Sequence, residues 1–164
     1  MSQVEITKAT SAEDYTAGRT LIEEYAAALG VDLCFQNFSE EMAGLPKIYG
    51  SPYGCLLLAR TNGELVGCVA VRNQGETVCE MKRLYMKPQH RGTGLGRRLA
   101  ESAIGYAQQL GYTRMVLDTL PSMTAAQSLY ESLGFREVEG YYQNPLSGVR
   151  YLTRELTKNE QYTA

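Results

Sequence analysis

The part of the chain that decides the fold runs from residue 77 to residue 111 and reads TVCEMKRLYMKPQHRGTGLGRRLAESAIGYAQQLG. We predict a β-strand from Thr77 to Met86, followed at Pro88 by a turn rich in glycine. Beyond the turn, apolar residues recur with the period of an amphipathic helix that is expected to stop at Gly111. These apolar residues are Leu95, Leu99, Ala103, Ala107 and Leu110.

The turn from Arg91 to Arg97 predicts a binding site for an anion. Glycine lets backbone amides approach a ligand closely, and the first N–H groups of the following helix have no partner within the helix. The dinucleotide-binding fingerprint does not fit, because Arg97 stands where its third glycine would fall. The P-loop pattern does not fit either, because no Gly-Lys-Ser/Thr follows. A phosphate group is the favoured ligand, and the alternative is a glycine-rich turn without a ligand.

The N-terminal residues predict a strand followed by a long helix. Val4 and Ile6 alternate with polar neighbours, which is the pattern of a strand with one buried face. Thr10 and Glu13 have the spacing of a capping box at the start of a helix. Gly30 supplies the stop signal of that helix.

The next segment predicts irregular chain and then a β-hairpin. Proline and glycine interrupt the apolar spacing of residues 31–52, so we expect a short helix followed by irregular chain. The predicted strands 54–60 and 64–72 flank Asn62-Gly63, a strong signal for a two-residue hairpin turn.

The C-terminal part of the chain completes a mixed α/β pattern. Residues 114–120 predict a buried strand, and Ser122 is placed to cap a further helix. Residues 135–139 and 149–156 predict two final strands. No internal repeat interrupts this order, so we expect one globular domain over residues 1–164.

Composition excludes several classes of function. The net charge of -2, with both signs interspersed, argues against nucleic acid as a partner. No apolar run resembles a signal peptide or a membrane span, so the expected location is the cytoplasm, without a membrane partner. The spacing of Cys34, Cys55, Cys68 and Cys79 and the single histidine, His90, predict neither a metal site nor a disulfide framework.

Two motifs together resemble the GCN5-related N-acetyltransferase (GNAT) superfamily. The pattern Arg-x-x-Gly-x-Gly from Arg91 to Gly96 is similar to the loop that holds the coenzyme A diphosphate in that family. The segment from Leu129 to Phe135 reads LYESLGF and is similar to the family's Leu-Tyr-x-x-x-Gly-Phe. The resemblance covers residues 54–156 well and the N-terminal strand and helix loosely.

The resemblance implies a fold and a donor. The fold is a single-domain, mostly antiparallel mixed sheet with splayed central strands and flanking helices. The donor is acetyl-coenzyme A, bound without a metal. Its expected contacts are the backbone of Leu84, Tyr85 and Met86 and the loop residues Arg91, Gly92, Thr93, Gly94, Leu95, Gly96 and Arg97.

The resemblance also implies catalytic roles for two side chains. Tyr130 occupies the position of the tyrosine that protonates the leaving thiolate, although a buried helical tyrosine is commonly a core residue. Glu80 has the spacing at which some members of the family carry a base that takes the proton of the acceptor ammonium, directly or through water. In the competing interpretation it pairs with Lys82 or Arg83 or orients the acceptor. An acetyl-enzyme on Cys79 is disfavoured, because alternation directs it away from Glu80, so direct transfer is expected.

This sequence departs from the family pattern at one position, and the resemblance does not determine the identity of the acceptor. Met123 replaces an asparagine that contacts the coenzyme arm in many relatives. We expect a small molecule with a primary amine, and the alternatives are a protein lysine or N-terminus, or a coenzyme-binding module without turnover. A homodimer is left open. Residues expected near the acceptor are Phe35, Phe38, Tyr49, Tyr53, Arg72, Arg83, Arg150 and the segment 141–145.

Overall fold

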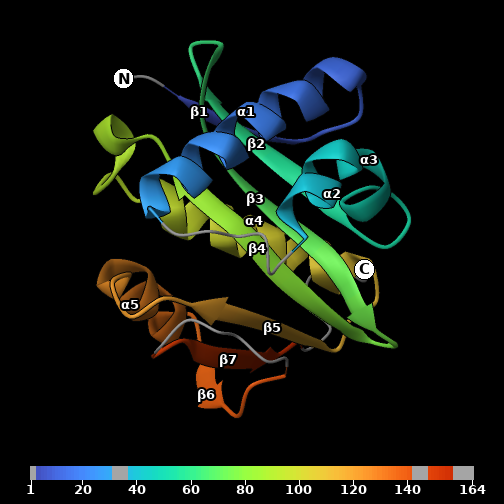
Figure 1. Cartoon of the computed structure of the whole chain (residues 1–164), viewed down its shortest axis with the longest axis vertical. Helices are drawn as coiled ribbons and strands as arrows, with labels where there is room; N and C mark the ends of the chain where they lie inside the picture. The colour runs from blue at the N-terminus through green and yellow to red at the C-terminus, as the bar shows by residue number, and fades with distance from the viewer. Residues whose placement is uncertain (1–2, 31–36, 142–147, 157–164) are drawn as a thin grey trace.

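The computed structural model describes residues 3–30, 37–141 and 148–156. Within them the chain forms one sheet with the strand order β1-β2-β3-β4-β5-β7-β6 (Figure 1). The strands are β1 (Val4–Lys8), β2 (Cys55–Thr61), β3 (Glu64–Gly75), β4 (Val78–Met86), β5 (Arg114–Thr119), β6 (Arg136–Val138) and β7 (Arg150–Glu155). The helices are α1 (Ala12–Leu29), α2 (Phe38–Ala43), α3 (Leu45–Ile48), α4 (Leu95–Gln109) and α5 (Thr124–Ser132), with a 3-10 turn η2 (Pro88–His90).

The sheet is splayed at its centre, as the family resemblance implied. All neighbouring strands are antiparallel except β4 and β5, which run parallel and pair only at Val78, Cys79 and Glu80 of β4. Figure 1 shows the two strands diverging from these paired ends. A bulge helps to redirect β4, because Arg83 adopts a left-handed backbone with φ 61 and the register with β3 shifts beside it. The remainder of β4 therefore has one edge that β5 does not cover.

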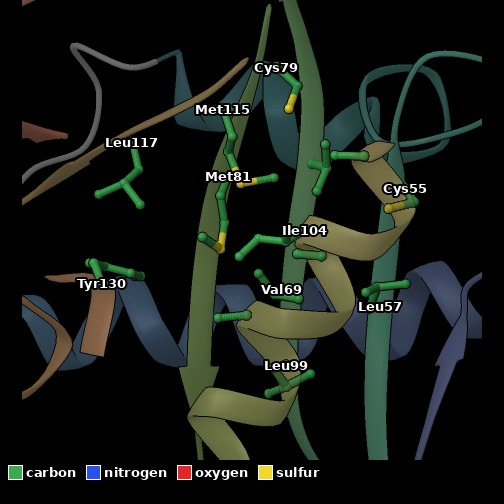
Figure 2. Packing of buried hydrophobic residues seen from close by; sticks show 14 of the residues in the cluster. Cys55, Leu57, Val69, Cys79, Met81, Leu99, Ile104, Met115, Leu117 and Tyr130 are labelled. Atoms are coloured by element: carbon green, nitrogen blue, oxygen red, sulfur yellow. The ribbon is translucent and has the colours of Figure 1, made fainter. Parts of the chain in front are cut away.

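Two cores form because both faces of the central strands are covered. The run CLLLA of β2 is buried throughout, as expected for a strand enclosed between helical layers. Leu57 faces the cluster under α4, together with Leu99 and Met81 (Figure 2), whereas Leu56 and Leu58 face the cluster under α1. The alternation of side chains along β2 thus supplies both cores. No helix in the described part of the chain is long and apolar enough to span a membrane.

Local signals are largely confirmed, with two corrections at helix starts. Asn62 and Gly63 both have positive φ, 51 and 80, which suits the predicted tight turn between β2 and β3. The capping box of α1 is formed by Ser11 and Asp14, so the prediction for Thr10 was wrong by one residue. Helix α5 follows Met123 without a side-chain cap, so the predicted capping by Ser122 was also wrong.

Candidate active site

A cleft opens where β5 separates from β4. Its floor and walls come from the uncovered edge of β4, the last turns of α1, the end of β5 and the start of α5. The lining residues are Tyr25, Leu29, Met81, Lys82, Arg83, Leu84, Asp118, Thr119, Leu120, Met123, Ala126 and Tyr130. The cleft therefore exposes backbone groups of β4 to an extended ligand. Polar side chains of β4 and β5 line the same cleft.

The glycine turn at the start of α4 has the geometry of an anion site. Gly92 and Gly94 have φ of 77 and 86, and a Cβ at either position would meet nothing within 4 Å. Gly94 is the N-cap of α4 and provides no side-chain cap, so the first N–H groups of the helix are left to other partners. At Gly96 a Cβ would lie 2.9 Å from Cε of Met86, so the glycine allows α4 to pack closely on β4. These features fit the diphosphate of coenzyme A.

The polar side chains of the turn bind its own backbone. Arg91 donates from Nε to the carbonyl of Met86 at 3.3 Å, and Thr93 donates from Oγ1 to the carbonyl of His90 at 2.7 Å. Both contacts hold the turn in shape, and the guanidinium of Arg91 lies at the strand end that leads into it. Their predicted contact with coenzyme A stays a prediction.

The first turn of α4 is anchored from both sides. Leu95 is buried in the core, whereas Arg97 donates from Nη2 to Oγ of Ser132 on α5 at 2.5 Å. Arg97 also pairs with Glu101 one turn further along α4 at 3.4 Å. The link to Ser132 ties the glycine turn to the helix that carries Tyr130.

The strand residues expected along the coenzyme arm differ in the direction of their side chains. Leu84 lines the cleft, and Met86 packs beside the α4-side core. Tyr85 points to α1, where its ring meets Tyr25 edge to face at 6.0 Å and its hydroxyl donates to Glu24 at 3.4 Å. This agrees with a role carried by the backbone of these residues, which stays a prediction.

Tyr130 lies in the cleft wall formed by α5. Its side chain is 8% exposed and packs edge to face on Phe135 at 5.8 Å, and Figure 2 shows its ring pointing from α5 toward β4. Burial raises the pKa of Tyr130, with smaller contributions from Tyr25 and Asp118, so its hydroxyl is protonated at neutral pH. Among the described residues no hydrogen bond engages this hydroxyl, which is available as a proton donor to a group in the cleft.

Glu80 is enclosed at the point where β4 and β5 separate. It is 1% exposed, and Arg72, which faces it across the β3–β4 ladder, donates from Nε to Oε1 at 2.7 Å. Tyr141 donates its hydroxyl to Oε2 at 2.5 Å. Glu80 is not among the residues that line the cleft. Glu80 thus forms its ion pair with Arg72, whereas the sequence suggested only Lys82 or Arg83 as its partner.

Arg83 forms a buried ion pair that joins β4 to α2. Its guanidinium binds Glu41 through two hydrogen bonds, from Nε at 3.0 Å and from Nη2 at 2.7 Å. The Tyr49 hydroxyl adds a third bond to Glu41 at 2.7 Å, and the rings of Phe38 and Tyr25 lie 5.6 and 6.0 Å from the guanidinium carbon. The charge of Arg83 is therefore satisfied within the protein.

Two charged residues of the cleft were missed as site residues. Lys82 is 9% exposed on the β4 wall and was considered only as an ion-pair partner. Asp118 lies on the β5 wall, and the signal for it was a carboxylate directly after the apolar run MVL of this strand. Met123 also lines the cleft, so a thioether replaces the family asparagine at this wall.

Other residues expected near the acceptor lie outside the cleft. Arg150 pairs with Glu131 and Glu137 at 3.0 and 3.2 Å, between α5 and the β6–β7 edge. Tyr53 is 66% exposed. Phe35 and residues 142–145 lie outside the described residues.

The described cysteines have no reactive character. Cys55, Cys68 and Cys79 are buried, and burial raises the pKa of Cys79 to about 12. A thiol of this kind does not supply a nucleophile at neutral pH, which supports direct transfer. Cys34 lies outside the described residues, and within the described chain no three side chains of His, Cys, Asp or Glu are grouped to hold a metal.

Comparisons with known proteins agree with this geometry. An uncharacterized N-acetyltransferase of Schizosaccharomyces pombe is 42% identical over 96% of this chain and 98% of its own length. The N-acetylaspartate synthetase of Xenopus tropicalis is 34% identical over 60% of this chain, but only 37% of that protein is matched.

Solved structures share the fold. An acetyltransferase from Streptococcus agalactiae superposes with a TM-score of 0.76 at 23% identity, over 93% of this chain and 98% of that one. An acetyltransferase from Salmonella typhimurium, solved with its cofactor acetyl-CoA, has a TM-score of 0.68 at 20% identity, over 94% and 95% of the two chains. The model of the acetyltransferase (GNAT) family matches residues 19–135. The chain belongs to this family and is an N-acetyltransferase of the GNAT type.

Proposed function

We propose that this protein transfers the acetyl group of acetyl-coenzyme A directly to the primary amine of a small molecule. The observation that carries the proposal is the cleft between β4 and β5, which Tyr130 lines and which β4 shares with the glycine turn that follows this strand. The diphosphate would bind the amides of Gly92, Gly94 and Gly96, and the coenzyme arm would pair with the uncovered edge of β4. The relative named N-acetylaspartate synthetase supports a small acceptor.

Tyr130 is proposed as the general acid of the reaction. The acceptor nitrogen attacks the thioester carbonyl, the carbon–sulfur bond breaks, and the thiolate takes a proton from the tyrosine hydroxyl. A phenol whose pKa is raised by burial remains protonated until a strongly basic group appears beside it. The departing thiolate is such a group.

Glu80 is proposed as the base, with Tyr141 as the link to the acceptor. Neither Glu80 nor Tyr141 is among the residues that line the cleft, so a water molecule would carry the proton from the acceptor ammonium to the Tyr141 oxygen. As this oxygen accepts the proton, the Tyr141 hydroxyl, which stands 2.5 Å from Oε2, passes its own proton to the Glu80 carboxylate. The charge of Arg72 holds Glu80 in place for this step.

Thiol release from acetyl-coenzyme A, measured over a panel of amines with mass analysis of the products, tests the proposed function. We expect stoichiometric thiol and acetylated amine with at least one class of small acceptor. Acetylation only of proteins or peptides would replace the small acceptor by a protein. Binding of acetyl-coenzyme A without thiol release to any acceptor would make the chain a binding module.

A further inference from the structure

Two tyrosines from different helices line the cleft within the described part of the chain. Tyr130 belongs to α5 and is proposed as the general acid, whereas Tyr25 belongs to α1 and has no part in the reaction proposed above. Tyr25 stands in the last turns of its helix, on the wall that α1 contributes to the cleft. A phenol on this wall can contact a ligand that extends along β4.

Tyr25 is held against the section of β4 that is proposed to bind the coenzyme arm. Its ring meets Tyr85 edge to face, with the ring centres 6.0 Å apart. The guanidinium carbon of Arg83 lies 6.0 Å from the centre of the same ring. Leu84 stands between these two residues in the strand and lines the cleft. The contacts therefore fix Tyr25 beside the backbone along which the thioester would lie.

The hydroxyls of the two tyrosines occupy the same part of the cleft. Both side chains line it, and the charge that Tyr25 would carry contributes to the raised pKa of Tyr130, after burial. An electrostatic contribution of this kind weakens with distance, so the two hydroxyls are close. Tyr130 is proposed to stand at the sulfur of the thioester. The carbonyl carbon is bonded to that sulfur, so a hydroxyl beside Tyr130 is within reach of the carbonyl oxygen.

The surroundings of Tyr25 suit a hydrogen-bond donor that keeps its proton. Burial raises the pKa of Tyr25 to about 12, so its hydroxyl is neutral at pH 7. The charge of Arg83 acts in the opposite direction on this pKa, which means that it polarises the hydroxyl and strengthens it as a donor. A fixed donor of this type stabilises an oxygen that becomes negatively charged only during the reaction.

We propose that Tyr25 is a second catalytic residue, whose hydroxyl donates a hydrogen bond to the carbonyl oxygen of the thioester. The inference rests on the proposed function and adds the group that stabilises this oxygen. As the acceptor nitrogen bonds to the carbonyl carbon, an electron pair of the carbonyl double bond moves onto the oxygen beside Tyr25. When that pair restores the double bond, the carbon–sulfur bond breaks and Tyr130 protonates the thiolate. The proton that the nitrogen releases replaces the one given up by Tyr130, and Tyr25 keeps its own.

Carbon-13 NMR of acetyl-coenzyme A labelled at the carbonyl carbon tests this contact without any acceptor. A hydrogen bond to a carbonyl oxygen moves the resonance of its carbon to higher frequency. We expect this shift when the donor binds the wild type, and Tyr25→Phe should lose a large part of it. The affinity measured by calorimetry should fall by less than about tenfold, because one neutral hydrogen bond contributes little to binding. The ring that packs on Tyr85 is preserved in this variant.

Two further proteins exclude indirect effects on the resonance. Tyr15→Phe removes another hydroxyl of α1, which donates to the carbonyl of Tyr49 at 3.2 Å outside the cleft, and should keep the wild-type shift. A ring-fluorinated tyrosine in place of Tyr25 has a more acidic hydroxyl and should move the resonance further to higher frequency. This second change keeps the inference testable if Tyr25→Phe does not fold.

Kinetics with an acceptor found in the amine panel give a second measurement. Tyr25→Phe should lower kcat by at least about tenfold and leave KM for acetyl-coenzyme A nearly unchanged, because the hydrogen bond is strongest in the transition state. Tyr15→Phe should keep the wild-type kcat.

The outcomes separate this inference from the proposed function. A wild-type carbonyl resonance in folded Tyr25→Phe would overturn the inference, and continued thiol release would leave acetyl transfer standing. The same resonance with a raised KM for the acceptor would also overturn it and assign Tyr25 to acceptor binding. A wild-type protein that does not bind the labelled donor would contradict the proposed function, and this inference with it.

Discussion

Glu80 combines almost complete burial with contacts to two other polar side chains. A carboxylate bound by Arg72 and Tyr141 could serve only as a clamp between β3 and the segment that follows β6, or it could also receive protons through Tyr141. The two roles predict different responses to the same substitution. A clamp affects stability, whereas a base affects the pH dependence of the rate.

Glu80→Gln tests these roles, because it keeps the shape and removes the charge. If Glu80 is the base, kcat/KM at neutral pH should fall by about 10²-fold or more and recover partly at high pH, where the free amine is more abundant. The pH–rate profile and the thermal midpoint are measured on the same variant. A lower midpoint with an unchanged profile would establish the clamp instead.

Tyr141→Phe is the matched control for the proposed relay. It removes the hydroxyl that donates to Oε2 of Glu80 and leaves the ring that packs on Tyr151 at 5.3 Å. With a relay, this variant should reproduce the loss of rate seen in Glu80→Gln. A wild-type rate would exclude Tyr141 from the proton path.

Tyr130→Phe should lower kcat while leaving the affinity for acetyl-coenzyme A nearly intact. General acid catalysis contributes about 10²- to 10⁴-fold, and the ring that packs on Phe135 is preserved. Steady-state kinetics and calorimetric titration measure the two quantities. A loss of kcat well below tenfold would show that water protonates the thiolate.

At the scale of single elements, the glycine turn and α4 act as one unit. The left-handed conformation of Gly94 directs the chain from η2 into the helix, and the helix N-terminus then faces open space. An anion at this point meets both the amides and the positive end of the helix dipole. Only the backbone is required, which explains why a short sequence pattern predicts the site.

Gly94→Glu should weaken acetyl-coenzyme A binding by at least about tenfold, because it adds a side chain and a negative charge where a phosphate would bind. Gly111→Glu is the matched control: Gly111 also has a left-handed φ, 94, but follows the other end of α4. Both variants carry similar backbone strain, so only the first should lose affinity in a titration. Equal affinities in two folded variants would remove the turn from the donor site.

The N-cap of α1 shows that a local sequence pattern predicts a helix start only to within one residue. Thr10 and Glu13 have the spacing of a capping box, and so do Ser11 and Asp14 one residue later. The structure uses the second pair, with Ser11 accepting from the Asp14 amide at 3.1 Å. The packing of Leu21 and Ile22 on the sheet sets the rotation of α1, so tertiary contacts choose between two equivalent local signals.

At the scale of the whole molecule, the ion pair of Glu41 and Arg83 attaches the α2–α3 layer to the bulge of β4. Burial alone would raise the pKa of Glu41, but the hydrogen bonds and charge of Arg83 outweigh it, so the pKa is lowered. A carboxyl with a lowered pKa in the folded state contributes stability above its unfolded value. That contribution is lost as the pH falls through the folded value.

Glu41→Gln should therefore lower the free energy of unfolding at pH 7 by about 3–5 kcal/mol, because it leaves the buried Arg83 charge without its counterion. The wild type should lose this advantage as the pH falls below 4.5, the ordinary value for the carboxyl. Denaturant titrations at several pH values measure both effects. The double variant Glu41→Leu/Arg83→Met should regain much of the loss, and failure to do so would contradict a simple charge imbalance.

The amino-acid sequence by itself determined the elements, the glycine turn and the family. These features depend on residues near one another in the chain, so hydrophobic period, Asn62-Gly63 and the run from Arg91 to Arg97 suffice to predict them. The mixed sheet with splayed centre came from the family resemblance, and the pairing of β4 with β5 confirms it.

Only the tertiary structure decided which charges meet. Glu41 lies 42 residues from Arg83, and Tyr141 lies 61 residues from Glu80, so no local pattern relates them. Even Arg72 and Glu80 become partners only through the register of β3 with β4. Lys82 and Asp118 line the same cleft because β5 separates from β4 after three paired residues. Strand order and register are properties of the whole sheet, so sequence motifs do not predict which side chains line the cleft.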